Sequence, residues 1–221
     1  MATFHFSFDL NHFHFIQQSF YRNPVWTLQR TAIVTLFLVC AGAGQAVAIA
    51  QQQPAARFWR RWAQVAGCAL LVTLGSWWMF PASYISFGVL HGIAVMLLIV
   101  RFTAWWGRLR WPLGLIALAL PLLVQDPFFD QRSTNWIGLV TTGPFTEDFV
   151  PVLPWLGVIW WAAAATDALL RHRRTLLAGP IAPGFVPFAA LGRWSLTFYM
   201  LHQPLLLGLV AAAAWLMHRS A

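Results

Sequence analysis

The hydrophobic residues of this chain gather in long runs that polar stretches separate. The runs lie, in chain order, at residues 1–15, 27–50, 62–80, 85–101, 111–124, 152–170 and 190–217. Each run predicts a membrane-spanning helix, which needs about 20 mostly apolar residues. The first is the weak one, because 15 residues cover about 22 Å of a roughly 30 Å hydrocarbon layer. We expect an all-α transmembrane bundle of about seven spans, forming a single domain over residues 1–221.

The composition excludes an ordinary soluble globule. Hydrophobic residues make up 59% of the chain and charged residues only 9%, which is too little polar surface to cover a water-soluble protein. The net charge of +8 comes entirely from arginine. In a soluble protein this charge would suggest a nucleic-acid partner, but here the arginines fall in the connections between spans. The positive charge is therefore explained by the orientation of the protein in the membrane. No nucleic-acid partner is expected.

The arginines predict that orientation because they occupy alternate connections. They lie at Arg57, Arg60 and Arg61, at Arg101, Arg108 and Arg110, and at Arg171, Arg173, Arg174 and Arg193. Four of the six acids, in contrast, belong to the connection 125–151. By the positive-inside rule the basic connections are cytoplasmic and 125–151 is outside, with the N-terminus inside. The connection 125–151 is too long for a simple link, and we expect it to fold back as a lid or re-entrant segment.

Ionisable residues inside a span are costly and mark candidate sites. In "FHFSFDLNHFHF", His5, Asp9 and His12 are spaced to share one helix face. An imidazole whose second nitrogen is held by a carboxylate is the arrangement of a general base, so we expect Asp9 to orient His5. The alternative is that Asp9 anchors a helix end, with His12 and His14 merely wetted at the outer interface.

Two more histidines lie in predicted spans. His91 stands in "FGVLHGIAV" and His202 in "SLTFYMLHQP", and both could converge with His5 on one polar cavity. The alternative for each is a core histidine that bonds a backbone carbonyl freed by a nearby Gly or Pro, such as Pro204.

Other polar residues have structural explanations. Asp148 precedes "VPVLPW" and could cap the helix that starts there. Asp167 and Arg30 lie near span ends, where we expect them to cap or to reach the interface. The sequence has no nucleotide-binding loop and no His or Cys pair at zinc spacing, so no metal is expected.

Six motifs in chain order resemble one family. They are "HFSFDLN", "FLVCAGAGQAVA", "RFWRRW", "YISFGVLHGIA", "EDFVPVLPWLGV" and "LGRWSLTFYMLHQP". Together they are similar to the heparan-alpha-glucosaminide N-acetyltransferase catalytic-domain family, and specifically to its short bacterial members.

The resemblance implies a multi-pass enzyme of the bacterial inner membrane. Such an enzyme passes an acetyl or acyl group from cytoplasmic acetyl-CoA to an amino sugar or envelope glycan on the outer side. The implied catalytic residues are His5, as the base or as a transient carrier of the acyl group, and Asp9, which orients it. Substrate-binding residues would be Asn11, His12, His91, Asp148, Tyr199, His202 and Gln203, with Tyr199 or His202 polarising the thioester carbonyl. CoA phosphates would bind Arg57, Arg60, Arg61 and Arg193.

One departure from the family pattern keeps other functions open. The family usually begins its first span with an Arg-x-x-Asp-x-x-Arg-Gly-like stretch, and none precedes "HFSFDLN" here. We therefore expect either a start further upstream or a truncated copy. The alternatives are a proton-coupled transporter of small solutes and a non-catalytic envelope assembly protein. Expected partners are membrane lipids and the glycan acceptor, and a homodimer is compatible with the sequence.

Overall fold

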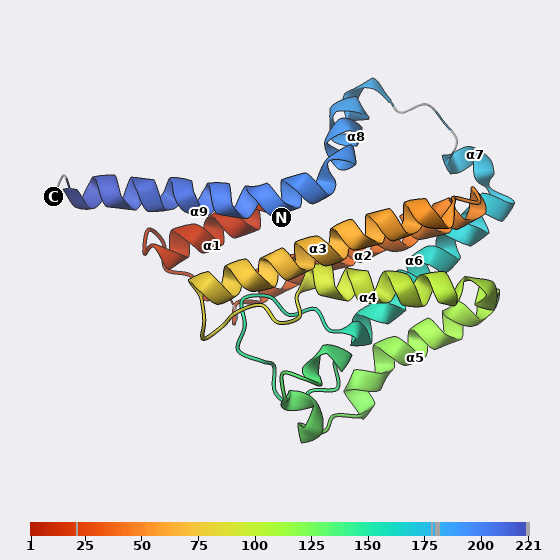
Figure 1. Cartoon of the computed structure of the whole chain (residues 1–221), viewed down its shortest axis with the longest axis horizontal. Coiled ribbons are helices and arrows are strands. Elements are labelled where there is room, and N and C mark those ends of the chain that lie inside the picture. Colours follow the sequence, from red (N-terminus) through yellow and green to blue (C-terminus); the bar gives the residue numbers. More distant parts are fainter. Residues whose placement is uncertain (21, 178, 180–181, 220–221) are drawn as a thin grey trace. The chain divides into compact units, whose positions relative to one another are not determined.

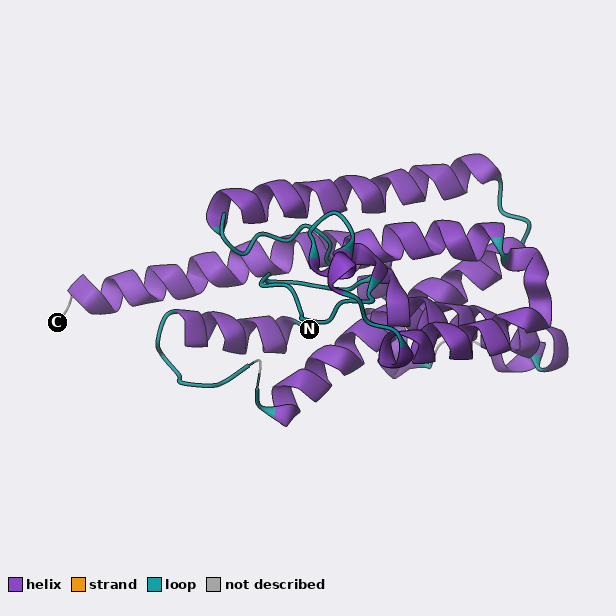
Figure 2. Ribbon diagram, turned by 90° about the horizontal axis from the view of Figure 1, so that it is seen from below, coloured by secondary structure: helices purple, strands orange, loops and turns teal. Residues whose placement is uncertain are grey.

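The computed structural model describes residues 1–20, 22–177, 179 and 182–219. The elements are α1 (Ala2–His12), α2 (Pro24–Ala50), α3 (Ala55–Met79), α4 (Val89–Phe102), η1 (Ala104–Leu109), α5 (Arg110–Leu123), η2 (Pro127–Asp130), η3 (Asn135–Ile137), α6 (Val152–His172), α7 (Arg174–Leu177), η4 (Pro183–Phe185), α8 (Val186–Arg193) and α9 (Ser195–Arg219), where η marks a 3-10 helix. No strand occurs in this part of the chain (Figure 2), which confirms the all-α prediction.

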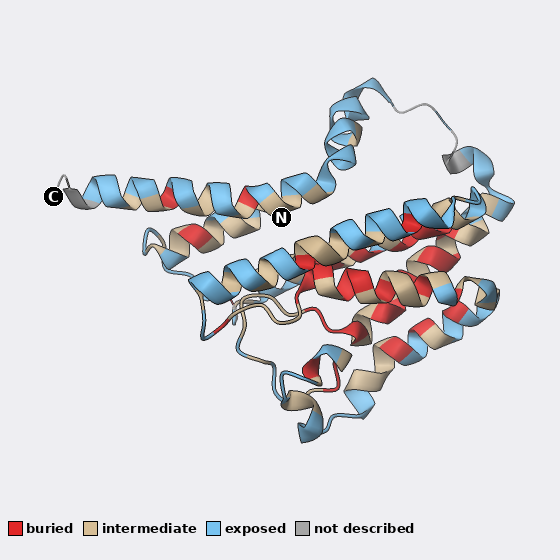
Figure 3. Cartoon of the chain, in the orientation of Figure 1, coloured by how far each residue is buried: buried red, intermediate tan, exposed pale blue. Residues whose placement is uncertain are grey.

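The chain forms two compact units. The first unit comprises Met1–Ile33 and Pro180–Ala221, and the second comprises Val34–Gly179. In the first unit α1 packs along α9 (Figure 1). In the second unit α3, α4, α5 and α6 pack on one another, and the buried residues gather on α4 and α6 (Figure 3). The prediction of a single domain stays a prediction.

Three helices among the described residues are long and apolar enough to cross a membrane, namely α2, α6 and Ser195–Met217 of α9. A fourth span results if α4 and the η1–α5 segment, which are bent by 100° relative to each other, count as one. The chain is therefore a multi-pass membrane protein. The helix α1 has 11 residues, which reach about 16 Å. Helix length and composition thus support three or four spans among the described residues, and not seven.

One predicted run begins later than expected, and another is interrupted. Residues 80–88 are not helical, because Pro81 and Gly88 interrupt the run, and α4 begins at Val89. His91 therefore lies in the first turn of α4, whereas the sequence predicted a position in mid-span. The run 190–217 is interrupted at Trp194, between α8 and α9.

Close helix contacts in the second unit depend on glycine. A Cβ added to Gly42 of α2 would lie 2.6 Å from the carbonyl oxygen of Ile159, and one added to Gly157 of α6 would lie 2.4 Å from the carbonyl oxygen of Gly114. No side chain fits at these distances, so the helices approach through backbone. In the small-residue stretch 41–48 of α2, Gly42 therefore serves helix packing. Gly44 in the same stretch has no neighbour that a Cβ would meet.

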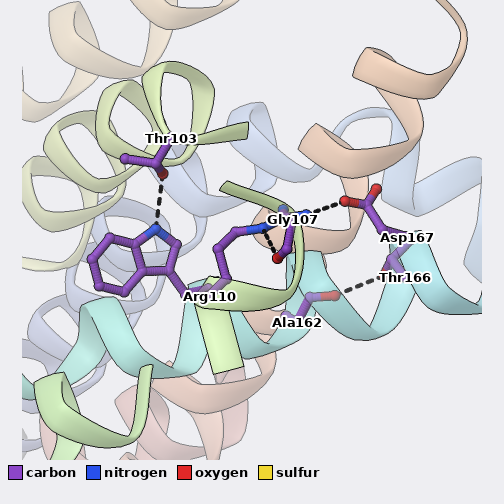
Figure 4. A network of polar contacts seen from close by, with 7 residues as sticks. Thr103, Gly107, Arg110, Ala162, Thr166 and Asp167 are labelled. Atoms are coloured by element: carbon purple, nitrogen blue, oxygen red, sulfur yellow. Dashed lines mark hydrogen bonds and ion pairs between the residues drawn. The ribbon is translucent and has the colours of Figure 1, made fainter. Parts of the chain in front are cut away.

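A buried ion pair joins the start of α5 to the end of α6 (Figure 4). The guanidinium of Arg110, only 2% exposed, donates to the carboxylate of Asp167, which is 21% exposed. The Nε of Arg110 also donates to the carbonyl of Gly107. Asp167 therefore bonds to a side chain instead of capping a helix, while its position near the interface stays a prediction. Arg110 begins α5 and is not a loop residue. Each charge is costly to bury alone, and pairing reduces that cost.

The basic connections of the second unit share one end. The guanidinium of Arg101, at the end of α4, lies 5.1 Å from the ring centre of Phe58, near the start of α3. The Arg110–Asp167 pair places the start of α5 beside the end of α6. The α2–α3 turn, the α4–α5 turn and the end of α6 therefore lie together, as Figure 1 shows. This grouping is what one consistent membrane orientation requires.

The acidic connection 125–151 folds back onto residues 80–89, at the opposite end of α4. The Ser83 hydroxyl donates to Glu147 at 2.6 Å, and the Thr146 hydroxyl donates to the Tyr84 carbonyl. Asp148 accepts from the Val89 amide at 2.7 Å, so its carboxylate caps α4. The expectation that Asp148 caps the following helix, α6, is therefore wrong. Folding places Asp148 beside a helix start far away in the sequence.

We expect Asp167→Ala to lower the free energy of unfolding by about 3 kcal/mol, because Arg110 would be left buried without its counter-charge. Denaturation followed in detergent measures the change. Arg108→Ala, an exposed arginine two residues from Arg110, is the control and should change the free energy by about 0.5 kcal/mol or less. Equal effects of the two substitutions would contradict a stabilising ion pair.

The turn at Asp130 should loosen in acid. The Asp130 carboxylate accepts from the hydroxyl and the amide of Thr141 and from the amide of Thr142, and these bonds hold its pKa below the ordinary value. A lowered pKa means that the stabilisation is present above the ordinary carboxyl pKa and lost as the pH falls through the lowered value. Amide exchange at Thr141 and Thr142 should follow this course. Asp130→Asn should weaken protection at neutral pH, whereas the control Asp126→Asn should not.

Candidate active site on α1 and α9

Two residues of α1 face two residues of α9 within the first unit. The imidazole rings of His5 and His202 contact each other edge to face, with 5.0 Å between ring centres. One turn along α1, the Oδ1 of Asp9 accepts a hydrogen bond from the Nε2 of Gln203 at 2.9 Å. Residues far apart in the sequence therefore form one polar cluster, which we call the α1–α9 cluster: His5, Asp9, His202 and Gln203.

The α1–α9 cluster is buried but incompletely bonded. Asp9 is 1% exposed and His202 is 7% exposed. Among the described residues, Asp9 Oδ2, His202 Nε2 and Gln203 Oε1 are buried without a hydrogen-bond partner. A buried polar atom without a partner costs about 1–3 kcal/mol, so such atoms usually meet water or a ligand. Three of them in one cluster are the strongest sign of a ligand site in this structure.

The hydrogen bonds of His202 fix which of its nitrogens carries the proton. Its Nδ1 lies 3.1 Å from the carbonyl oxygen of Phe198 and 2.7 Å from that of Tyr199. Both neighbours only accept, so Nδ1 carries the hydrogen, and the Nε2 of the neutral ring has a free lone pair. Neutral His202 can therefore accept a proton at Nε2 but cannot donate one there to a thioester carbonyl.

The carbonyl contacts also bear on the structural alternative for His202. They agree with a histidine bonded to backbone carbonyls of its own helix. The carbonyls are those of Phe198 and Tyr199, whereas Pro204 frees the carbonyl of Met200. The missing amide of proline is therefore not the cause of these bonds.

The predicted pairing of His5 with Asp9 differs from what is observed. No hydrogen bond joins these two side chains in the described structure, and Asp9 is bonded to Gln203. The partner comes from the neighbouring helix because α9 packs against the face that His5 and Asp9 share. The His5 ring faces His202 instead.

Two further predicted residues lie at the end of α1. Asn11 and His12 line a hollow of about 280 Å³ together with Phe8, Gln18, Ser19 and Phe20. The Oδ1 of Asn11 accepts from the Gln18 amide at 2.6 Å, which folds the following loop back onto α1. The buried ring of Phe20 packs on Phe8 and secures this loop. His12 is exposed at the hollow, which agrees with the alternative that this side chain is only in contact with solvent.

Tyr199 lies beside the cluster, with 5.8 Å between the centres of its ring and the His202 ring, and its role in substrate binding stays a prediction. Phe198 stacks on the same imidazole, with 5.7 Å between ring centres and an interplanar angle of 12°. The α9 side of the site is therefore built from one continuous helical stretch.

His91 and Asp148 belong to the second unit and meet at the start of α4. The Thr73 hydroxyl donates to the Ile85 carbonyl, so His91 Nε2 must donate to Thr73, 3.0 Å away. The Nδ1 of His91 then accepts from the Gly88 amide at 3.3 Å. Both ring nitrogens are thus occupied, and His91 acts as a structural link at this helix start. The alternative reading of His91 expected a bond to a backbone carbonyl. The observed partner of Nε2 is the Thr73 hydroxyl.

The arginines predicted to bind CoA lie on both units. Arg57, Arg60 and Arg61 are exposed in the first turns of α3, and Arg193 is exposed at the end of α8. A common phosphate site for all four stays a prediction. In the described residues no group of three or more His, Cys, Asp and Glu side chains could hold a metal ion.

The sequence comparison decides the family. Residues 1–204 match the family described as heparan-alpha-glucosaminide N-acetyltransferase, catalytic. The chain belongs to this family. Comparisons with curated proteins and with solved structures gave no match.

Sequence reasoning missed several contacts of this family member. The Arg110–Asp167 pair could have been suspected, because an arginine and an aspartate lay at neighbouring ends of two predicted helices. The Thr73–His91 and Gln203–Asp9 bonds had no local signal, since each joins residues from different helices. The family match itself marks no residue roles in this chain.

Gln203→Ala should destabilise the first unit, because buried Asp9 would lose its hydrogen-bond donor. We expect a loss of about 1–3 kcal/mol in the free energy of unfolding. Denaturation in detergent measures it, with exposed Leu205→Ala on the same helix as the control. Equal stability of Gln203→Ala and the control would mean that the Asp9–Gln203 bond does not hold α1 on α9.

Proposed function

We propose that this family member transfers an acetyl or acyl group across the membrane. The donor is cytoplasmic acetyl-CoA, and the acceptor is an amino sugar or envelope glycan on the outer side. The observation that carries the proposal is the α1–α9 cluster, where buried acceptor atoms remain unbonded in a chain of an acetyltransferase family. An amine or hydroxyl group is the kind of donor that such atoms can bind.

Proton transfer is the chemistry that His5 and His202 support. The acceptor amine or hydroxyl would form a bond to the thioester carbonyl carbon while the C–S bond to CoA breaks. A neutral imidazole can take the acceptor's proton and return it to the departing CoA thiolate. The lone pair on His202 Nε2 suits this role, and His5 lies against the same ring. The carboxylate of Asp9 would stabilise the positive imidazolium formed beside it. We therefore assign the base to the His5–His202 pair rather than to His5 alone.

The exposed arginines of the second unit fit the phosphates of the donor. Acetyl-CoA supplies the thioester from which the acetyl group is taken. In the described chain no carboxylate lies within ion-pair distance of Arg57, Arg60 or Arg61, so their charges are free for an anionic ligand. Arg193, which is exposed in the first unit, is a separate candidate for binding a phosphate. These residues would bind and orient the donor without taking part in proton transfer.

The proposed orientation is that of a bacterial inner-membrane protein with about seven spans. The shared basic end of the second unit supports a cytoplasmic position for that end, and the acidic connection 125–151 would then face outward. In this arrangement α1, α3, α4 and α5 cross the membrane together with α2, α6 and α9. Short helices such as α4, with 14 residues, would need thinning of the layer or interfacial residues at their ends.

The test is acetyl transfer by the purified protein. Labelled acetyl-CoA is supplied with glucosamine or with cell-envelope sugars, and label in the acceptor is measured. We expect His5→Ala and His202→Ala each to lower kcat by about 100-fold or more, because each removes a group that moves a proton. His14→Ala, an exposed histidine just beyond α1, is the matched control and should retain activity.

Full activity in both His5→Ala and His202→Ala would contradict the assigned site. Solute uptake by reconstituted vesicles without any acetyl transfer would instead favour the proton-coupled transporter. Circular dichroism of each variant separates loss of chemistry from loss of folding.

A further inference from the structure

The turn between α4 and α5 exposes a belt of large apolar side chains around one arginine. Phe102, Trp105, Leu109 and Trp111 are exposed by 64%, 81%, 58% and 43%, respectively. Arg108 is exposed among them. Tryptophan and arginine are the residues typical of a membrane–water interface, where the ring lies among the headgroups and the guanidinium reaches phosphate. We call these five residues the α4–α5 belt.

The belt is presented by a rigid turn. Gly107 adopts φ of +55°, a conformation that favours glycine, and its carbonyl accepts from the Nε of Arg110 at 3.2 Å. On the other side the indole of Trp160 donates to the hydroxyl of Thr103 at 3.0 Å (Figure 4). The two bonds tie Thr103, just before η1, and Gly107, within η1, to the buried side chains of Trp160 and Arg110.

The buried ion pair also decides the charge of this end of the second unit. Asp167 is the acid nearest to it, and Arg110 neutralises that acid. The other four acids of the second unit lie in 125–151, which packs at the opposite end of α4. Beyond Asp167, three arginines are exposed: Arg171 at the end of α6, Arg173 directly after it and Arg174 at the start of α7. Together with Arg108 they have no carboxylate within ion-pair distance in the described chain.

We propose that the α4–α5 belt and the arginines at the end of α6 form a binding surface for anionic lipid headgroups. The uncompensated positive charge complements anionic lipids of the cytoplasmic leaflet, and the exposed rings of Trp105 and Trp111 enter the headgroup layer. A soluble phosphate would use the arginines but would leave these rings in water. This surface is separate from the proposed acetyl transfer and does not depend on it.

The test is the thermal stability of the full chain in detergent as lipid is added. Phosphatidylglycerol should raise the melting temperature more than phosphatidylcholine does, and salt should reduce the difference. Each arginine removed should increase the phosphatidylglycerol concentration at half-effect by about five-fold. The variants are Arg108→Gln and Arg173→Gln, singly and combined. Trp105→Ala should reduce the stabilisation by both lipids.

Arg22→Gln, an exposed arginine of the first unit, is the charge-matched control and should behave as the unsubstituted chain. Equal stabilisation by the two lipids, or an unchanged half-effect concentration in the combined arginine variant, would overturn the proposal. The same stabilisation by inorganic phosphate or CoA, added without lipid and lost in the arginine variants, would also overturn it, because the surface would then be a soluble-phosphate site.

Discussion

Buried polar groups in an apolar chain must find partners inside the protein, and this constraint accounts for the main long-range contacts of the structure. Arg110 pairs with Asp167, His91 links Thr73 to the start of α4, and Asp148 caps that start from a distant loop. Each contact offsets the cost of removing a polar group from water. Each also joins helices that apolar packing alone would leave free to slide or rotate.

The α1–α9 cluster is where this constraint is only partly met. Asp9 and Gln203 bond to each other, yet each retains an acceptor oxygen without a partner, and His202 retains a lone pair. In the second unit the Gln45 Nε2, a donor, and the Asn135 Oδ1 are also buried without a hydrogen-bond partner. What distinguishes the cluster is the combination of unbonded acceptors with two imidazoles in contact.

Charge is separated along the second unit in a way that follows from its helix pairing. Antiparallel packing of α3 on α4 and of α5 on α6 brings alternate connections to the same end. The basic connections lie at one end and the acidic connection folds over the other. This separation of charge fits one membrane orientation. It also leaves different arginines of the basic end for the two proposed roles: some for acetyl-CoA phosphates and others for anionic lipid.

The sequence by itself determined the all-α fold, the family and the approximate positions of the helices, because apolar runs and ordered motifs are local signals. It also placed His5, Asp9, His202 and Gln203 among the candidate residues, because ionisable groups in apolar runs stand out. Only the tertiary structure decided that Asp9 bonds to Gln203 rather than to His5 and that the Nε2 lone pair of His202 has no partner. It also decided that the Nε2 of His91 is hydrogen-bonded to Thr73. The physical reason is that a hydrogen bond within a few ångströms depends on which helix face meets which neighbour, and helical periodicity in one segment contains no information about its partner.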